Sequence, residues 1–341
     1  MTCLVTGANG FVGSHLARTL IEHGDQVRVL VRPESDLRAL EGLPVDIAYG
    51  DLRDPAALAA AVRGVKRVFH AAADYRLWAS RPQEIYDTNV RGTQNLLEAA
   101  RREGAERFIY TSSVATIAVE QPSGLPNEQT ETELSEMVGH YKRSKYLAER
   151  EALRAAQDGF PVIVVNPTTP VGPGDWKPTP TGRIILDFLN GRMPAYLQTG
   201  LNLVPVEDVA TGHWLAAERG RIGERYILGS RNLMLKEILD MLAAITGLPS
   251  PWVRLPHTVA LAFGHADQLL SRLLDRPTRI PLEGVRMARH KMFVDGSKAQ
   301  RELGFEPGSV EVALERAINW YRHNHYAPAG SPRETKYNVA A

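Results

Sequence analysis

A glycine turn near the start of this chain constrains its fold more than any other feature. The letters VTGANGFVG at residues 5–13 follow a few apolar strand residues and lead into a helical pattern that Gly24 ends. In such a turn Gly7 permits the tight bend, Gly10 lets backbone N–H groups approach a pyrophosphate, and Gly13 lets the helix pack closely on its strand. The sequence therefore predicts a strand, turn and helix that bind the phosphates of a nucleotide.

Strand and helix patterns alternate along the first half of the chain. Apolar and β-branched runs predict strands at residues 3–5, 26–31, 45–49, 65–70, 107–111 and 161–165. Apolar residues spaced three and four apart predict further helices at residues 55–63, 83–103 and 140–157. This alternation predicts an α/β fold in which residues 1–166 form a doubly wound parallel sheet of the Rossmann type.

The composition changes after Asn166. A Pro- and Gly-rich stretch follows, which predicts a crossing without regular structure, and residues 167–327 are expected to form mainly a smaller C-terminal substrate lobe with some segments returning to the sheet. Helices are expected at residues 183–190, 206–218, 235–246, 259–274 and 310–323. The apolar segment 259–274 is expected to pack within the lobe, with a place at a membrane surface or over an apolar substrate as the alternatives. Residues 328–341 are expected to be a polar tail.

Composition excludes several classes of function. Lys and Arg number 40 against 39 Asp and Glu, so no basic surface for nucleic acid is expected. The single cysteine, Cys3, allows no internal disulfide and suits a reducing compartment. No integral membrane segment and no metal site are expected, because the chain has neither a run of about 18 apolar residues nor an HExxH motif. We therefore expect a cytoplasmic protein, with peripheral contact to a membrane as an option.

The motif YKRSK, which includes Tyr141 and Lys145, carries the predicted chemistry. The pKa of a free tyrosine is about 10. Proton transfer near neutrality therefore needs this pKa to fall by roughly 3 units, which corresponds to about 4 kcal/mol. A cation about 4 Å away at an effective dielectric of about 20 supplies that order of energy, and Lys145 lies one turn along the same helix face. Ser113, at the end of the strand at 107–111, is expected to hydrogen-bond the substrate oxygen. Together they predict hydride transfer at a secondary alcohol or ketone.

Arg32 predicts which nicotinamide dinucleotide is used. It stands at the end of the second strand, where NAD enzymes place an Asp or Glu on the ribose 2′-hydroxyl. An arginine there favours a 2′-phosphate, so NADP is expected and NAD is the less expected cofactor. The alternative is an ordinary solvated arginine. Asp51 and Leu52 follow the third strand beside the expected adenine, and small residues, Ala71, Ala72 and Ala73, follow the fourth.

These motifs resemble the extended short-chain dehydrogenase/reductase superfamily, specifically its NAD-dependent epimerase/dehydratase group. The resemblance covers nearly the whole chain and includes TGANGFVG, YTSSVAT, YKRSK and SKAQRELGF. The segments HAAADYRLW at 70–78, NPTTPVGP at 166–173 and GLNLV at 200–204 are most similar to the hopanoid-associated sugar epimerase family, which is itself similar to dihydroflavonol 4-reductases.

The resemblance implies roles for individual residues. The implied catalytic residues are Ser113, Tyr141 and Lys145. The implied cofactor contacts are Gly7, Asn9, Gly10, Phe11, Val12, Gly13, Arg32, Asp51, Leu52, Ala71, Ala72, Ala73, Asn89, Thr111, Tyr141, Lys145, Pro167 and Thr168. Substrate contacts are expected from Asp74, Tyr75, Ser113 and Thr169, with Arg76 and Trp78 beside them. Nucleotide-sugar epimerases commonly carry Asn where Thr169 stands, which argues against a UDP-sugar substrate.

Three functions remain open on the sequence. An epimerase would keep its cofactor and return the hydride to the opposite face of a keto intermediate, as the nearest family implies. A dihydroflavonol reductase-like enzyme would reduce a carbonyl and release oxidised cofactor. A non-enzymatic NADP sensor or scaffold is the third alternative. A small-molecule substrate is expected in the first two cases. A homodimer that pairs the helices at 93–103 and 141–157 is expected in this superfamily.

Overall fold

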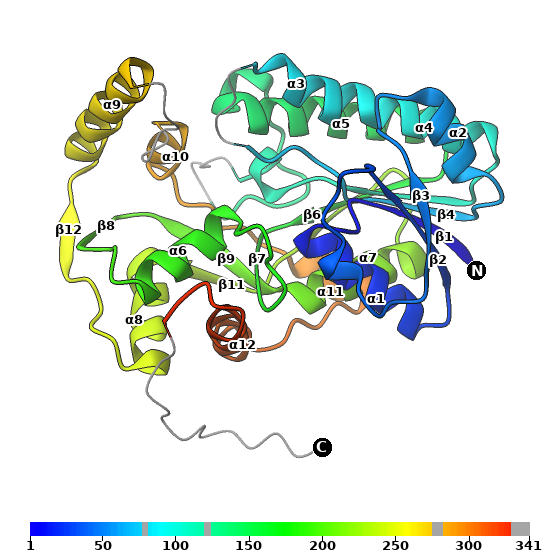
Figure 1. The fold of residues 1–341 in the computed structure, drawn as a ribbon. Helices are drawn as coiled ribbons and strands as arrows, with labels where there is room; N and C mark the ends of the chain where they lie inside the picture. Colours follow the sequence, from blue (N-terminus) through cyan, green and yellow to red (C-terminus); the bar gives the residue numbers. More distant parts are fainter. Residues whose placement is uncertain (77–80, 119–123, 275–281, 329–341) are drawn as a thin grey trace.

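A seven-stranded parallel sheet forms the centre of the molecule in the computed structural model, which describes residues 1–76, 81–118, 124–274 and 282–328 (Figure 1). The strand order is β10-β6-β5-β4-β1-β2-β3, and every neighbouring pair is parallel. The strands are β1 Thr2–Thr6, β2 Gln26–Val31, β3 Val45–Tyr49, β4 Arg67–His70, β5 Arg107–Thr111, β6 Val162–Pro167 and β10 Arg225–Leu228. The predicted doubly wound α/β fold is confirmed, with β10 as an added edge strand.

Helices cover both faces of this sheet (Figure 1). One layer contains α1 Phe11–Glu22, α7 Val206–Arg219 and α11 Ser297–Leu303, and the other contains α2 Pro55–Val62, α4 Gly92–Arg102 and α5 Gly139–Gln157. Strand β6 shows why its residues form a continuous apolar run. Val162 and Val164 enter one core, whereas Ile163 and Val165 enter the other, because successive side chains of a strand point to opposite faces.

A smaller lobe follows β6. Its strands are β7 Thr169–Val171, β9 Gly200–Pro205 and β11 Arg231–Met234 in one sheet and β8 Ala195–Leu197 and β12 Val253–Leu255 in another. Its helices are α6 Pro180–Leu189, α8 Leu235–Thr246, α9 His257–Leu273, α10 Leu282–Met287 and α12 Val310–His323. Side chains of α6, α8 and α12, among them Ile185, Leu239 and Leu314, form a separate buried core.

The structure corrects several predicted elements. The Pro-rich crossing is not wholly irregular, because β7 forms within it and pairs with β9. Helix α6 begins at Pro180 because the Thr179 hydroxyl accepts the backbone N–H of Gly182 and so caps the helix. The helix predicted at 83–103 is divided into α3 Gln83–Tyr86, a π-helical segment Asp87–Arg91 and α4. Short 3₁₀ helices occur at Arg38–Leu40, Val114–Thr116 and Leu134–Glu136. The predicted tail beyond 328 lies outside the described residues.

The crossing between the lobes is fixed by a buried carboxylate. Asp175 Oδ2 accepts hydrogen bonds from the backbone N–H and hydroxyl of Thr179 and from the hydroxyl of Tyr321, each at 2.8 Å. Nearby, the guanidinium of Arg38 lies 4.6 Å from the ring centroid of Trp176. These contacts tie the crossing to α12 and to the segment after β2, so the two lobes are held together beside the carboxyl edge of the main sheet.

Candidate active site

The glycine turn after β1 has no room for side chains. Gly7 has a φ of +71°, and a Cβ there would lie 2.7 Å from the backbone nitrogen of Ala72. A Cβ on Gly13 would lie 2.1 Å from the carbonyl oxygen of Gly7. Gly10, the N-cap of α1, offers no side chain to the first turn of that helix. The backbone amides at this helix terminus therefore fit a pyrophosphate, as the cofactor of a Rossmann fold requires.

A chain of buried hydrogen bonds fixes the loop that faces this turn. The Ala72 N–H donates to Thr6 Oγ1 at 3.2 Å, and Thr6 Oγ1 lies 2.7 Å from His70 Nδ1. On the other side, His70 Nε2 lies 2.9 Å from Thr93 Oγ1, which donates to the carbonyl oxygen of Asn89 at 2.6 Å. These hydrogen bonds join β1, β4 and α4 next to the loop of residues 71–74.

The hydrogen-bond partners of His70 determine which of its two ring nitrogens carries the proton. Because the hydroxyl proton of Thr93 is given to a carbonyl, His70 Nε2 must carry the proton that it donates to Thr93. His70 Nδ1 then accepts from Thr6, so the imidazole is neutral. Complete burial, with the charge of Lys145 nearby, lowers the pKa of His70 from its usual 6.5 to about 3.

Asn89 serves as a clamp. Its Nδ2 donates to the carbonyl oxygen of Asp74 and to Ser144 Oγ, both at 2.9 Å, and its Oδ1 accepts from the Asp74 N–H at 2.7 Å. Both amide hydrogens are therefore committed to the protein. The Asn89 side chain thereby holds the 71–74 loop against α5, and its predicted contact with the cofactor stays a prediction.

Ser113 and Tyr141 are brought together at the end of β5. Their side chains are hydrogen-bonded, and Ser113 also accepts the backbone N–H of Ala115 at 3.1 Å as the cap of a 3₁₀ turn. Burial raises the pKa of Tyr141 above its usual value of 10, and the hydrogen bond from Ser113 opposes that rise. In this geometry Tyr141 therefore keeps its proton at neutral pH.

Lys145 is held at the carboxyl end of β5, and its predicted effect on the pKa of Tyr141 stays a prediction. Its Nζ donates to the carbonyl oxygen of Thr111 at 2.6 Å and lies 4.6 Å from the ring centroid of Tyr110. Burial lowers the pKa of Lys145 to about 7, while the carboxylate of Glu149 acts in the opposite direction. The ammonium thus sits at the carboxyl end of β5, one helix turn from the tyrosine, with a pKa close to neutrality.

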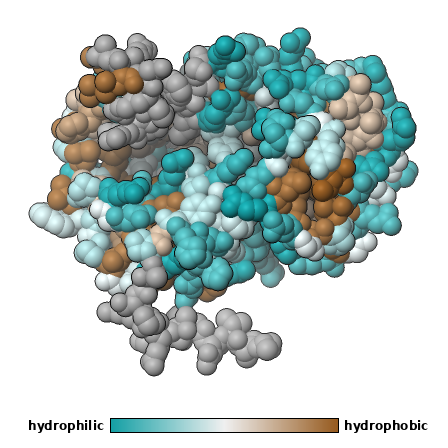
Figure 2. All heavy atoms as spheres, viewed as in Figure 1, coloured by the Kyte–Doolittle hydropathy of each residue, from teal (hydrophilic) through white to brown (hydrophobic). Residues whose placement is uncertain are grey.

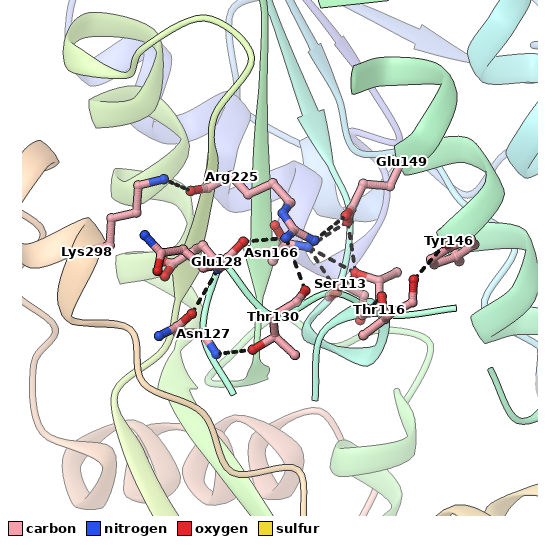
Figure 3. A network of polar contacts seen from close by, with 12 residues as sticks. Ser113, Thr116, Asn127, Glu128, Thr130, Tyr146, Glu149, Asn166, Arg225 and Lys298 are labelled. Carbon is pink, nitrogen blue, oxygen red and sulfur yellow. Dashed lines mark hydrogen bonds and ion pairs between the residues drawn. The ribbon is translucent and has the colours of Figure 1, made fainter. Parts of the chain in front are cut away.

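A buried polar network holds the backbone of Ser113 from behind (Figure 3). The carboxylate of Glu149 accepts from Thr116 Oγ1 at 2.9 Å and from Asn166 Nδ2 at 2.8 Å, and it pairs with Arg225 at 3.3 Å. Asn166 Nδ2 also lies 3.2 Å from the carbonyl oxygen of Ser113, and Thr116 Oγ1, whose one proton is shared between that oxygen and the carboxylate, lies 2.8 Å from it. The network therefore links the segment that follows β5 to β6, β10 and α5.

Thr111 and the start of the crossing lie close to Ser113 and Tyr141. The Thr111 hydroxyl is 2.8 Å from His213 Nε2, while His213 Nδ1 donates to the carbonyl oxygen of Val209 at 2.7 Å. Burial lowers the pKa of His213 to about 4. Pro167 ends β6, and the Thr168 hydroxyl donates to the Leu228 carbonyl oxygen at 3.3 Å. Both Pro167 and Thr168 are buried at the carboxyl edge.

The residues expected near the adenosine part lie at the ends of β1, β2 and β3. Arg32 is exposed and makes no ion pair with any residue that the structure describes, although it acts electrostatically on the carboxylate of Asp51. Asp51 itself is paired with Arg53 at 2.8 Å. Leu52 is buried under α4, and Asn9 Nδ2 lies 3.5 Å from the carbonyl oxygen of Asp36. Phe11 and Val12 are half-buried in the first turn of α1.

The expected substrate contacts are only partly brought together. Asp74 is paired with Arg76 at 2.6 Å, while the Tyr75 hydroxyl reaches toward the carbonyl oxygen of Lys177 in the crossing at 3.4 Å. Thr169 is half-buried in β7, where it pairs with β9. Trp78 lies outside the described residues.

The sequence does not indicate the buried polar residues that lie behind this site. His70, His213 and Asn166 are buried polar residues whose partners are far away in the sequence, so no local pattern indicates them. Glu149 did leave a sequence signal, because it follows Tyr141 and Lys145 at the same spacing of four residues along one helix face.

Comparison with known proteins decides the family. The profile of the NAD dependent epimerase/dehydratase family matches residues 3–229, which include the glycine turn, the Ser113 strand and the YKRSK helix. This chain belongs to that family. The predicted membership of the extended short-chain dehydrogenase/reductases is confirmed, and the chain is an enzyme of this NAD-dependent group that acts on a small-molecule substrate.

Three relatives illustrate the range of activities in the family. A Synechocystis sp. protein named provisionally as a dihydroflavonol 4-reductase is 46% identical over 94% of this chain and 95% of its own length. Sterol demethylase protein B from Methylococcus capsulatus is 37% identical over 94% of this chain and 98% of its own. The crystal structure of a nucleoside-diphosphate-sugar epimerase from Pseudomonas aeruginosa is 29% identical, covers 96% of this chain and 99% of its own, and has a TM-score of 0.80.

The part of the chain that the structure describes offers neither a membrane span nor a metal site. No helix there is long and apolar enough to cross a membrane. No group of three or more His, Cys, Asp and Glu side chains there is arranged to hold a metal ion.

Proposed function

We propose that the protein reduces a ketone with NADPH and that Tyr141 donates the proton to the substrate oxygen. The observation that carries this proposal is the hydrogen-bonded pair of Ser113 and Tyr141 at the carboxyl end of β5. The carboxyl edge of a doubly wound sheet is where ligands bind, beside the point at which the strand order reverses. In this sheet β1 and β4 flank that point, and the glycine turn and the 71–74 loop follow them.

The direction of proton transfer follows from the burial of Tyr141. Because burial raises its pKa, the hydroxyl is protonated at neutral pH and suits a general acid. Reduction of a ketone places negative charge on the substrate oxygen, which takes up that proton. Ser113, hydrogen-bonded to the same hydroxyl, would hold the oxygen as the charge develops. The Synechocystis relative named as a reductase supports this direction.

The residues of the cofactor site fit a nicotinamide dinucleotide, which supplies the hydride when bound. The amides of the glycine turn would hold the pyrophosphate, and Pro167 and Thr168 would lie beside the nicotinamide. Lys145, whose ammonium lies at the end of β5, would hold the nicotinamide ribose. Arg32 would hold a 2′-phosphate, because it is exposed and has no ion-pair partner among the described residues.

Titration of both nicotinamide cofactors tests the preference for NADP. NADPH and NADH are titrated against the purified protein by fluorescence, with the Arg32→Asp variant and the matched Arg150→Asp variant on the exposed side of α5. A charge-assisted contact contributes roughly 1.5–3 kcal/mol, so Arg32→Asp should weaken NADPH binding by at least about tenfold and leave NADH binding unchanged. Arg150→Asp should change neither. Equal affinities in the unmodified protein would remove the preference for NADP.

An epimerase is the second candidate, because the Pseudomonas aeruginosa structure carries that description and the 166–173 segment resembles hopanoid-associated sugar epimerases. The two activities differ in the fate of the cofactor. A reductase consumes NADPH stoichiometrically with a ketone, whereas an epimerase returns its cofactor to the starting state. A panel of ketones followed by nicotinamide absorbance separates them, and tight binding of NADPH without turnover of any carbonyl or sugar would favour the sensor instead.

A further inference from the structure

Helix α9 presents an uncovered apolar face. Its buried side, with Ala260, Asp267 and Ser271, faces the neighbouring α10, and His257 Nε2 is 2.8 Å from the carbonyl oxygen of Val285. The exposed apolar side chains of α9 do not enter the lobe core, contrary to the expectation that this segment packs within the lobe. The exposed members, which we call the α9 face, are Val259, Ala262, Phe263, Ala266, Leu269, Leu270 and Leu274.

The geometry of the α9 face is that of an interfacial helix. At about 100° per residue its seven members fall within roughly 140° of the helix circumference, and none of them is charged. Phe263 is 58% exposed and Leu269 is 61% exposed. Phe263, with Val259, Ala262 and Ala266, lines a shallow hollow of about 470 Å³ along the helix. Figure 2 shows hydrophobic residues gathered over α9 at the upper left of the view. A contiguous apolar patch of this kind marks an interaction surface.

Charge around the α9 face indicates the nature of its partner. The described residues 251–274 and 282–291 contain five Lys and Arg against two Asp and Glu, whereas the whole chain is nearly balanced. Arg254, Arg286, Arg289 and Lys291 are exposed in the described part of this region. Trp252, which directly precedes β12, is 84% exposed. An exposed apolar helix face, with an exposed aromatic ring and exposed cations in the segments that precede and follow it, matches the layers of an anionic lipid interface.

We propose that the α9 face docks on the surface of a membrane that contains anionic lipids. The apolar side chains would enter the boundary between headgroups and acyl chains, and the flanking arginines and lysine would contact the headgroup phosphates. A second copy of this chain is the less suitable occupant. In a two-fold dimer the same surface of each copy faces the other copy, so the exposed arginines and lysine of the two copies would repel each other.

Vesicle co-sedimentation of the full chain tests the proposal. Vesicles of phosphatidylcholine with and without phosphatidylglycerol are compared at low and high salt. The unmodified protein should bind the anionic vesicles, and salt should weaken that binding because the charges at the surface are screened. Phe263→Glu and Leu270→Glu should each reduce binding by at least about tenfold. Val312→Glu, at an exposed apolar position of α12 that is 45% accessible, should bind as the unmodified protein does.

A second measurement reports how deeply the protein enters the bilayer and does not depend on those variants. Brominated phosphatidylcholine in the anionic vesicles should quench the fluorescence of Trp252, and Trp252→Phe should lose that quenchable component. Absence of binding to both vesicle types would overturn the proposal, as would Leu270→Glu binding that equals the unmodified protein. A dimer in light scattering that Leu270→Glu converts to a monomer, without any vesicle binding, would assign the α9 face to a second copy instead.

Discussion

Acid should destabilise this protein through His70. The imidazole is neutral and completely buried, with a pKa lowered from 6.5 to about 3. The unfolded chain therefore binds a proton in the pH range between about 3 and 6.5 that the folded chain does not bind. Stability contributed by the neutral imidazole is present above about pH 6.5 and is lost as the pH falls.

The magnitude can be worked out from the two pKa values. Each pH unit within that window costs about 1.4 kcal/mol for one proton, so His70 should cost roughly 2 to 3 kcal/mol between about pH 7 and about pH 4.5. His70→Gln cannot titrate. The unmodified protein should therefore lose that amount of its free energy of unfolding relative to His70→Gln as the pH falls across this interval. The titration of the other groups affects both proteins alike and cancels when the two free energies are subtracted.

Denaturant unfolding followed by tryptophan fluorescence measures this difference in the free energy of unfolding at each pH. His213→Gln is the companion variant. Burial lowers the pKa of His213 only to about 4, so the stability difference for this variant should stop changing at a higher pH than the difference for His70→Gln. A stability difference between the unmodified protein and His70→Gln that does not change with pH would refute the reasoning. It would mean that His70 titrates alike in the folded and unfolded chains and that the assigned neutral relay is wrong.

Three further predictions concern the site and the assembly. Glu149→Gln should shift the Lys145 limb of the pH-rate profile to lower pH, because the carboxylate raises the pKa of that lysine; an unmoved limb would contradict the coupling. Gly13→Ala places a Cβ 2.1 Å from the Gly7 carbonyl oxygen, so fluorescence titration should show at least about tenfold weaker binding of NADPH, and unchanged affinity would contradict the close packing. We propose a homodimer across α4 and α5, and light scattering should then give twice 37.7 kDa, whereas the monomer mass at micromolar concentrations would exclude it.

The parts of this protein that the sequence predicts well are those with a strong local signal. Strands β2, β3 and β5 have the predicted bounds, because their apolar and β-branched residues form short runs that turn or loop residues interrupt on both sides. The spacing of Tyr141 and Lys145 on one helix likewise needs no tertiary information. Both residues lie at the carboxyl edge of the sheet, as that spacing and the preceding strand indicated.

The parts that it does not predict depend on contacts between distant segments. Strand β7 forms in a proline-rich stretch because β9 supplies its partner more than thirty positions later. The position of Lys145 is set by the Thr111 carbonyl group, which the sequence pattern does not place beside it. The α9 face has the apolar periodicity of a core helix, so its sequence cannot show that the lobe leaves it uncovered.

The central claim is that Tyr141 donates the proton during ketone reduction, and Tyr141→Phe tests it most directly. This change removes one oxygen and leaves the ring in place. With any ketone that the unmodified protein reduces, turnover should fall by about 10²–10⁴-fold, while NADPH affinity should change by less than about threefold. Tyr146→Phe on the same helix, whose hydroxyl donates to the Thr132 carbonyl oxygen at 2.9 Å away from the pair, is the matched control and should retain turnover. Near-normal reduction by Tyr141→Phe would contradict the account.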